Sequence, residues 1–118
     1  MDVLVISDQP LTVLAMRAIL AREKGVESVV DATHMAEAMT QLQQGGIKLI
    51  VLDLDTHVMR PIGTPALMRE MWPQIPLAIL SSRDCDATIV KAVDLGVCGY
   101  MLKTADTETL RAAVRQML

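Results

Sequence analysis

Aromatic side chains are almost missing from this sequence: its 118 residues include no phenylalanine, one tryptophan and one tyrosine. A core without aromatic rings must be built from aliphatic side chains and from methionine, of which there are nine, because methionine fills irregular gaps in packing. Apolar residues make up 52% of the chain and charged residues 21%, a normal balance for a globular protein. We therefore expect one domain with one aliphatic core.

Long apolar runs and runs of basic residues are also missing. A membrane-spanning helix needs about 20 consecutive apolar residues, and no segment approaches that length. The Met-Asp start lacks the charged and apolar regions of a secretory signal, so we expect a cytoplasmic protein. The net charge of −3 and the absence of a Lys/Arg run argue against nucleic-acid binding by this domain.

Cysteine is scarce as well. Cys85 and Cys98 are the only two, and their spacing does not match the CxxC pattern of metal sites and redox motifs. In a chain with no secretory signal, reduced thiols are expected more often than a disulfide. We expect both cysteines to be free.

Short apolar runs alternate with amphipathic segments along the chain. This pattern is typical of a parallel sheet covered by helices on both faces. The predicted strands are residues 3–6, 28–30, 49–52, 77–80 and 98–102. The first, third and fourth are uninterrupted apolar runs, as expected of strands covered on both faces. The second is short and lies between Glu27 and Asp31, which suits the edge of a sheet.

Five amphipathic segments between and after these strands predict helices. They begin near residues 8–9, 33, 64, 84 and 106, and they end near residues 25, 45, 73, 96 and 118. Pro10 falls in the first turn of the first helix, and Pro65 takes the first position of the third. Thr33 is the expected N-cap of the second helix. The fold class is therefore α/β: a flavodoxin-like, doubly wound (βα)5 domain with strand order 2-1-3-4-5.

Polar residues that could form a common site follow the first, third, fourth and fifth predicted strands. Ligands of doubly wound sheets gather at the carboxyl ends of the strands. The residues expected at that edge are Ser7, Asp8, Asp53, Asp55, Ser81, Ser82 and Lys103. Together they hold carboxylates, hydroxyls and one ammonium group, all brought to the same edge by separate segments.

These residue types predict a phosphoryl-transfer site. Mg²⁺ prefers a few oxygen ligands, and Asp8, Asp53 and one backbone carbonyl are a sufficient set. An aspartate can itself be the nucleophile and form an acyl phosphate. Lys103 can place a positive charge beside a phosphoryl oxygen, and the Ser81 hydroxyl can bond another.

Four motifs resemble the receiver domain of two-component response regulators, along the entire chain. They are SDQPL at residues 7–11, VLDLD at residues 51–55, LSS at residues 80–82 and GVCGYMLKT at residues 96–104. The first and last are most similar to the NarL/LuxR-type branch. Receivers of that branch usually precede a helix-turn-helix DNA-binding domain, which the 118 residues do not include.

The resemblance implies a role for each matching residue. Asp53 is the phospho-acceptor, Asp8 a Mg²⁺ ligand, Asp55 a ligand through its backbone carbonyl, Ser81 the switch hydroxyl, Tyr100 the switch aromatic and Lys103 the phosphate-pairing lysine. The implied phosphodonor is a sensor histidine kinase or a phosphotransfer domain. The implied homodimer forms through the fourth helix, fifth strand and fifth helix, or through the first and fifth helices.

Two residues and one segment depart from the receiver pattern. Ser7 stands where receivers usually have a first acid, so we expect weaker Mg²⁺ binding. His57 stands where the family usually has proline, and VMRPIG at residues 58–63 replaces a glycine-rich turn. These changes predict a differently shaped loop beside the site and a short third helix.

Two other functions fit parts of the sequence. The DLD of residues 53–55 also occurs in haloacid-dehalogenase-type phosphatases, where the first aspartate is the nucleophile and the second a general acid. However, that motif follows the first strand of the phosphatase core, whereas two βα units precede Asp53 here. The loss of the first acid leaves open a receiver that takes no phosphate and serves as an interaction module.

Overall fold

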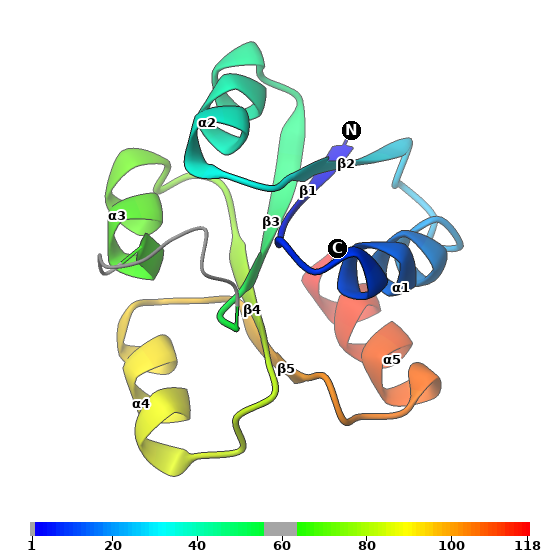
Figure 1. Cartoon of the computed structure of the whole chain (residues 1–118), viewed down its shortest axis with the longest axis vertical. Helices are drawn as coiled ribbons and strands as arrows, with labels where there is room; N and C mark the ends of the chain where they lie inside the picture. Colours follow the sequence, from blue (N-terminus) through cyan, green and yellow to red (C-terminus); the bar gives the residue numbers. More distant parts are fainter. Residues whose placement is uncertain (1, 56–63) are drawn as a thin grey trace.

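Five apolar runs form one parallel sheet, as predicted. The computed structural model describes residues 2–55 and 64–118. Its strands are β1 (Asp2–Ile6), β2 (Ser28–Ala32), β3 (Ile47–Asp53), β4 (Leu77–Ser81) and β5 (Gly99–Leu102). They pair in the order β2-β1-β3-β4-β5 (Figure 1), which confirms the predicted fold class and places β2 at an edge.

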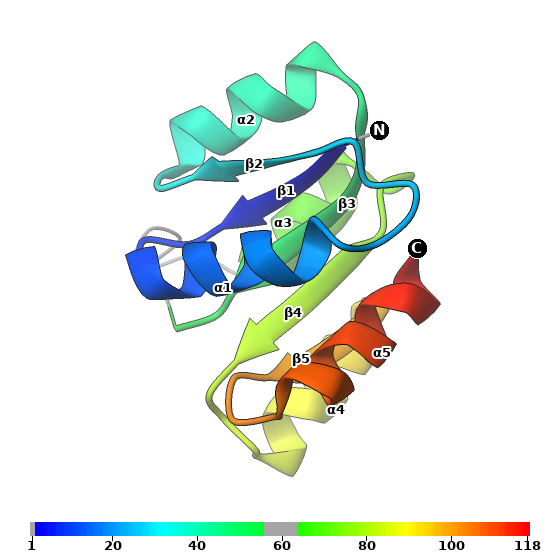
Figure 2. The ribbon, with the colours of Figure 1, turned by 90° about the vertical axis from the view of Figure 1, so that its right-hand side faces the viewer.

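Helices cover both faces of the sheet. They are α1 (Pro10–Leu20), α2 (Met35–Gln44), α3 (Thr64–Met71), α4 (Asp86–Asp94) and α5 (Thr107–Met117). In Figures 1 and 2, α1 and α5 lie together on one face, while α2, α3 and α4 lie on the other. At eight residues α3 is short, as the sequence predicts.

Alternating strand residues build two separate apolar layers. The layer under α2, α3 and α4 includes Leu4, Ile6, Ile50, Leu52, Ile79, Met68 and Ala92. The layer under α1 and α5 includes Val3, Val5, Leu49, Val51, Leu80, Met16, Leu20 and Val114. Trp72 and Tyr100 pack against the first layer, so the second layer is aliphatic apart from its methionines.

The predicted N-cap of α2 is wrong by one residue. His34, not Thr33, has the extended backbone of an N-cap, and its Nδ1 accepts a hydrogen bond from the Glu37 N–H at 3.4 Å. Glu37 reaches back past the cap, where its Oε1 accepts bonds from the Thr33 hydroxyl at 2.6 Å and the Thr33 N–H at 3.3 Å. The Thr33 hydroxyl is thus used as a donor to Glu37 and does not accept a helix N–H.

The starts of α1 and α5 agree with the sequence, whereas α1 already ends at Leu20. Asp106 caps α5, and its carboxylate accepts the Thr109 N–H at 2.8 Å, which lowers the pKa of Asp106. Gln9 is the N-cap of α1, with Pro10 at the first helical position, yet its side chain bonds no helix N–H. The Gln9 side-chain oxygen instead accepts a hydrogen bond from Lys103 Nζ at 2.8 Å.

A buried acid joins α1 to α5. Glu23, just beyond α1, is 9% exposed, and its Oε2 accepts a hydrogen bond from Arg115 Nε at 3.2 Å. Burial of a carboxylate is costly without a charged partner, and the partner here comes from α5. The pair therefore holds the ends of these two helices together.

Three further predictions concern single features. Cys85 and Cys98 are free, as expected. Among residues 2–55 and 64–118, no helix has both the length and the apolar character needed to cross a membrane. His57 and residues 58–63 lie outside the described residues, so the predicted loop shape stays a prediction.

The layered core predicts a large difference between two leucines. Leu4 is fully buried on β1, whereas Leu14 on α1 is 63% exposed. Replacing Leu4 with alanine removes buried methyl groups and leaves a cavity, so we expect a loss of about 2–5 kcal/mol in the free energy of unfolding. Leu14→Ala makes the same chemical change at the surface and should cost about 0.5 kcal/mol or less. Urea denaturation measures both; equal losses would contradict the assignment of Leu4 to the core.

Candidate functional site

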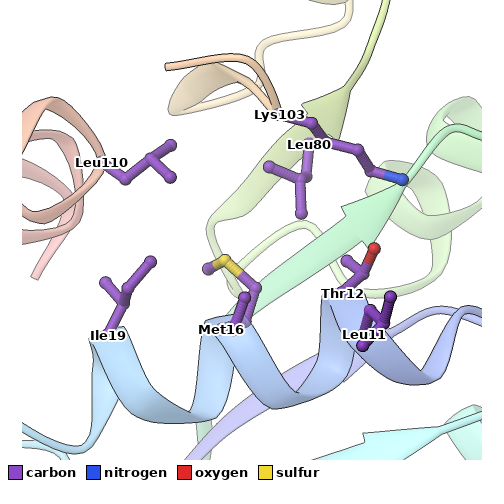
Figure 3. A pocket seen from close by; sticks show the side chains of 8 residues that line it. Leu11, Thr12, Met16, Ile19, Leu80, Lys103 and Leu110 are labelled. Atoms are coloured by element: carbon purple, nitrogen blue, oxygen red, sulfur yellow. The ribbon is translucent and has the colours of Figure 1, made fainter. Parts of the chain in front are cut away.

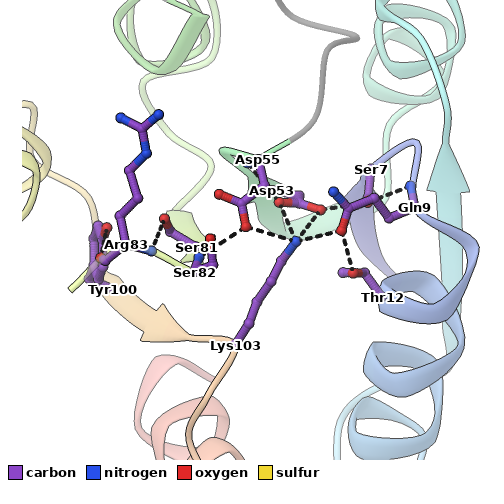
Figure 4. A network of polar contacts seen from close by, with 10 residues as sticks. All are labelled: Ser7, Gln9, Thr12, Asp53, Asp55, Ser81, Ser82, Arg83, Tyr100 and Lys103. Atoms are coloured by element: carbon purple, nitrogen blue, oxygen red, sulfur yellow. Dashed lines mark hydrogen bonds and ion pairs between the residues drawn. The ribbon is translucent and has the colours of Figure 1, made fainter.

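Polar side chains from four segments meet at the carboxyl edge of the sheet. Ser7 follows β1, Asp53 ends β3, Ser81 ends β4 and Lys103 follows β5. The parallel register brings them level: Asp53 lies opposite Leu80, and the Lys103 N–H bonds the Ser81 carbonyl at 2.8 Å. The fold therefore brings these residues together at one edge, as the sequence predicts (Figure 4).

Asp53 is a buried carboxylate surrounded by donors. It is 1% exposed. Its Oδ2 accepts the Ser7 hydroxyl at 2.7 Å, and its Oδ1 accepts the Asp55 N–H at 2.9 Å. Lys103 Nζ lies 2.9 Å from each of the two oxygens. A buried charge is stable only when it is paired and hydrogen-bonded, and Asp53 meets both conditions.

Lys103 is the cation that the site shares. Its Nζ contacts both oxygens of Asp53, Asp55 Oδ2 at 3.1 Å and Gln9 Oε1 at 2.8 Å. The side chain is 19% exposed, so these contacts are only partly screened by water. Two carboxylates are thus held close together by one ammonium group.

Asp55 contributes its side chain as well as its backbone. Burial raises the pKa of Asp55, but hydrogen bonds from Lys103 and Ser82 together lower it by more than burial raises it. The pKa therefore lies below its ordinary value. The Ser82 N–H bonds Asp55 Oδ2 at 3.0 Å. Asp55 is therefore ionised at neutral pH. The sequence predicts Asp55 at this edge and a ligand role mainly for its backbone carbonyl, but it does not predict the pairing of its carboxylate with Lys103.

Ser81 and Tyr100 are joined through Arg83. The buried Ser81 Oγ accepts the Arg83 N–H at 3.0 Å, and the Tyr100 hydroxyl donates to the Arg83 carbonyl at 2.9 Å. Neither hydroxyl bonds Asp53 in this arrangement, as Figure 4 shows. The two residues that the resemblance pairs are thus linked by one residue of the loop after β4.

Asp8 lies next to the buried Ser7 and is exposed to solvent. The carboxylates of Asp8 and Asp53 and the backbone carbonyl of Asp55 are hard oxygen donors, which fit Mg²⁺ in type. In the described part of the chain, no three His, Cys, Asp or Glu side chains cluster as a metal site.

Two site residues have roles that the sequence did not reveal. The sequence places Ser7 at this edge in place of the usual acid, but it does not predict that the Ser7 hydroxyl bonds Asp53 directly. Gln9 was considered only as a helix start, yet its amide oxygen bonds Lys103. No sequence signal identifies Gln9, because its partner is 94 residues away.

The arrangement suits nucleophilic chemistry at a carboxylate. Asp53 holds its charge beside an ammonium group that could also pair with an incoming anionic group. The Asp55 N–H remains bonded to the same carboxylate and fixes its orientation. A carboxylate in such a setting has the chemistry needed to form an acyl phosphate.

Comparison with known proteins points to one family. The response regulator receiver domain family matches residues 3–115. The nitrate/nitrite response regulator protein NarP of Escherichia coli (strain K12) is 30% identical over 114 residues, which cover 97% of this chain and 53% of NarP. The chain spans about half the length of the curated relatives it matches.

Solved structures agree. A response regulator from Thermotoga maritima superposes with a TM-score of 0.85 at 26% identity, covering 98% of this chain and 95% of that one. A response regulator protein from Burkholderia pseudomallei, solved with a phosphorylated aspartic acid, a calcium ion and citrate, has a TM-score of 0.74 at 27% identity. The match covers 95% of this chain and 65% of that chain.

The site predicts that the pKa of Asp55 depends on Lys103. A carboxyl group with a lowered pKa stabilises the folded protein above its unfolded pKa of about 4, and this stabilisation is lost as the pH falls through the folded value. Lys103→Met removes a hydrogen bond that lowers the pKa of Asp55, while burial continues to raise it. We therefore expect the pKa of Asp55 to be higher in the variant than in the unchanged protein.

Titration of the Asp55 side-chain carboxyl carbon by NMR measures this value. Lys91→Met, which removes an exposed ammonium from α4, is the matched control and should leave the pKa of Asp55 unchanged. An unchanged pKa in Lys103→Met would contradict the ion pair.

Proposed function

Because this chain belongs to the response regulator receiver domain family, we propose that it takes a phosphoryl group on Asp53 and changes its surface in response. A response regulator implies a cognate histidine kinase, and we propose a sensor histidine kinase or a phosphotransfer domain as the donor. The observation that supports Asp53 most strongly is its buried carboxylate at the sheet edge, 2.9 Å from Lys103. Members of the family are typically signalling domains and not conventional enzymes.

The proposed transfer leaves a phosphoryl group on a carboxylate oxygen. An oxygen of Asp53 attacks phosphorus, a P–O bond forms, and the P–N bond to the donor histidine breaks as the imidazole leaves with the electron pair and takes up a proton. Lys103 offsets the added negative charge, and the Asp55 N–H keeps the carboxyl group oriented. When bound by Asp8, Asp53 and the Asp55 carbonyl, Mg²⁺ supplies positive charge to the phosphoryl oxygens.

A change of partner at Ser81 is the proposed response to phosphorylation. The Ser81 hydroxyl now accepts the Arg83 N–H, and as a donor it could bond a phosphoryl oxygen on Asp53. A turn of the Ser81 side chain toward that oxygen would weaken its bond from the Arg83 N–H, and Tyr100 is bonded to the carbonyl of the same residue. The roles of Ser81 as switch hydroxyl and Tyr100 as switch aromatic therefore have a physical connection.

The output of the domain is a proposal that rests on its relatives. They are about twice as long as this chain, which supports a helix-turn-helix DNA-binding domain in the natural protein and control of transcription. The ExaE protein of Pseudomonas putida, 26% identical, is described as a transcriptional activator. We keep both proposed homodimer faces, the α4–β5–α5 face and the α1 and α5 face. A cytoplasmic location belongs to the same proposal.

Asp55 argues against a phosphatase. A haloacid-dehalogenase-type enzyme needs its second aspartate to donate a proton, whereas the lowered pKa keeps Asp55 ionised at neutral pH. An interaction module that takes no phosphate has more support, because Ser7 occupies one oxygen of Asp53. A phosphorylation experiment separates that module from a working receiver.

The first prediction is one stable phosphoryl group on Asp53. Incubation with Mg²⁺ and acetyl phosphate should add one phosphoryl group by intact mass, and the adduct should vanish in Asp53→Asn. Asp55→Asn keeps the backbone carbonyl and is the matched control, so it should still form the adduct. Absence of an adduct at every Mg²⁺ concentration would favour the interaction module, and continuous turnover of a phosphoester would favour a phosphatase.

The second prediction concerns Ser7, which stands where receivers usually have an acid. Ser7→Asp adds a carboxylate beside Asp53, so Mg²⁺ affinity should rise on the order of tenfold, because two charges about 4 Å apart interact by about 1 to 4 kcal/mol. Isothermal titration calorimetry measures the change. Ser7→Asn has nearly the same shape without the charge and should bring no gain. A similar gain in both variants would show that shape, and not charge, limits the binding of Mg²⁺.

A further inference from the structure

Lys103 connects the site to the first turn of α1. Four oxygens lie within 3.1 Å of its Nζ: two from Asp53, one from Asp55 and one from Gln9. A lysine ammonium has three N–H donors, so these four acceptors compete. Of the four, Gln9 Oε1 is neutral, and hydrogen bonds to charged acceptors are about twice as strong. The bond to Gln9 is therefore the one that yields first to a new anionic acceptor.

Gln9 is tied to both the site and the helix. Its N–H donates to Ser7 Oγ at 3.1 Å, and Ser7 donates in turn to Asp53. Its backbone carbonyl accepts the Val13 N–H at 3.1 Å, and its side-chain oxygen accepts the Thr12 hydroxyl at 3.2 Å. A continuous series of hydrogen bonds thus runs from Asp53 to the start of α1.

A cavity beside the site shares two of these residues. It lies between α1 and α5, has a volume of about 180 Å³, and is lined by Leu11, Thr12, Ala15, Met16, Ile19, Leu80, Lys103 and Leu110. Figure 3 shows Thr12 and Lys103 at the same end of it. Lys103 therefore belongs both to the site and to the lining of this cavity.

We propose that Gln9 is a positioning residue that couples the phosphorylation of Asp53 to α1 and to this cavity. The proposal rests on the proposed function. The phosphoryl group has three acceptor oxygens and a charge of about −1.5 to −2, which replaces the single negative charge of the Asp53 carboxylate. It draws Lys103 Nζ away from the neutral Gln9 oxygen. The first turn of α1 then loses its side-chain tether to β5, while Gln9 keeps its bond from Thr12.

NMR of the 15N-labelled protein tests the coupling. Acetyl phosphate and Mg²⁺ are added, intact mass gives the modified fraction, and spectra are compared at equal modified fraction. In the natural sequence, phosphorylation should shift the side-chain amide of Gln9 and the backbone amides of residues 11–13. In Gln9→Ala, the shifts of residues 11–13 should be at least twofold smaller. Gln43→Ala, the same change at an exposed position of α2, should show the full shifts.

The outcomes separate this inference from the proposed function. An adduct on Asp53 with no shift at residues 11–13, or with equal shifts in Gln9→Ala, overturns the coupling and leaves phosphorylation intact. Failure to form any adduct overturns the proposed function, and the coupling falls with it. Unchanged β3 resonances in unmodified Gln9→Ala show that the variant is folded.

Discussion

The ion pair between Asp53 and Lys103 is the interaction on which the site depends. Asp53 ends β3 with 1% of its surface exposed, and Lys103 follows β5, two strands away in the sheet. Neither side chain would be stable in this environment alone, because a buried charge without its partner costs several kcal/mol. The strand order that separates β3 from β5 by β4 sets their distance. The strand order therefore fixes the ion pair on which the chemistry of the site depends.

Much of the fold could be predicted because its signals are local. Uninterrupted apolar runs identify β1, β3 and β4, and Pro10 and Asp106 mark the starts of their helices. Thr33 shows the limit of this approach. Threonine and histidine can both cap a helix, and the choice depended on where the Glu37 side chain reaches. That is a contact of the folded state, which composition does not reveal.

Some residues of the site could likewise be predicted from local sequence, and others could not. Its carboxylates and its lysine could be predicted, because each stands directly after a strand and parallel strands bring such residues to one edge. Gln9 could not, and outside the site neither could Glu23, since each depends on a partner more than 90 residues away in the sequence. Gln9 is neutral and Glu23 is acidic, and nothing in their neighbours distinguishes them from exposed polar residues. Both lie on the α1 side of the sheet.

The scarcity of aromatic residues has a consequence for spectroscopy. The single tryptophan and the single tyrosine both pack against the layer under α2, α3 and α4. Intrinsic fluorescence therefore reports on that half of the core, while the aliphatic layer under α1 and α5 gives no optical signal of its own. If α1 and α5 loosened while the other layer stayed packed, the fluorescence would not change, although the first turn of α1 lies beside the site.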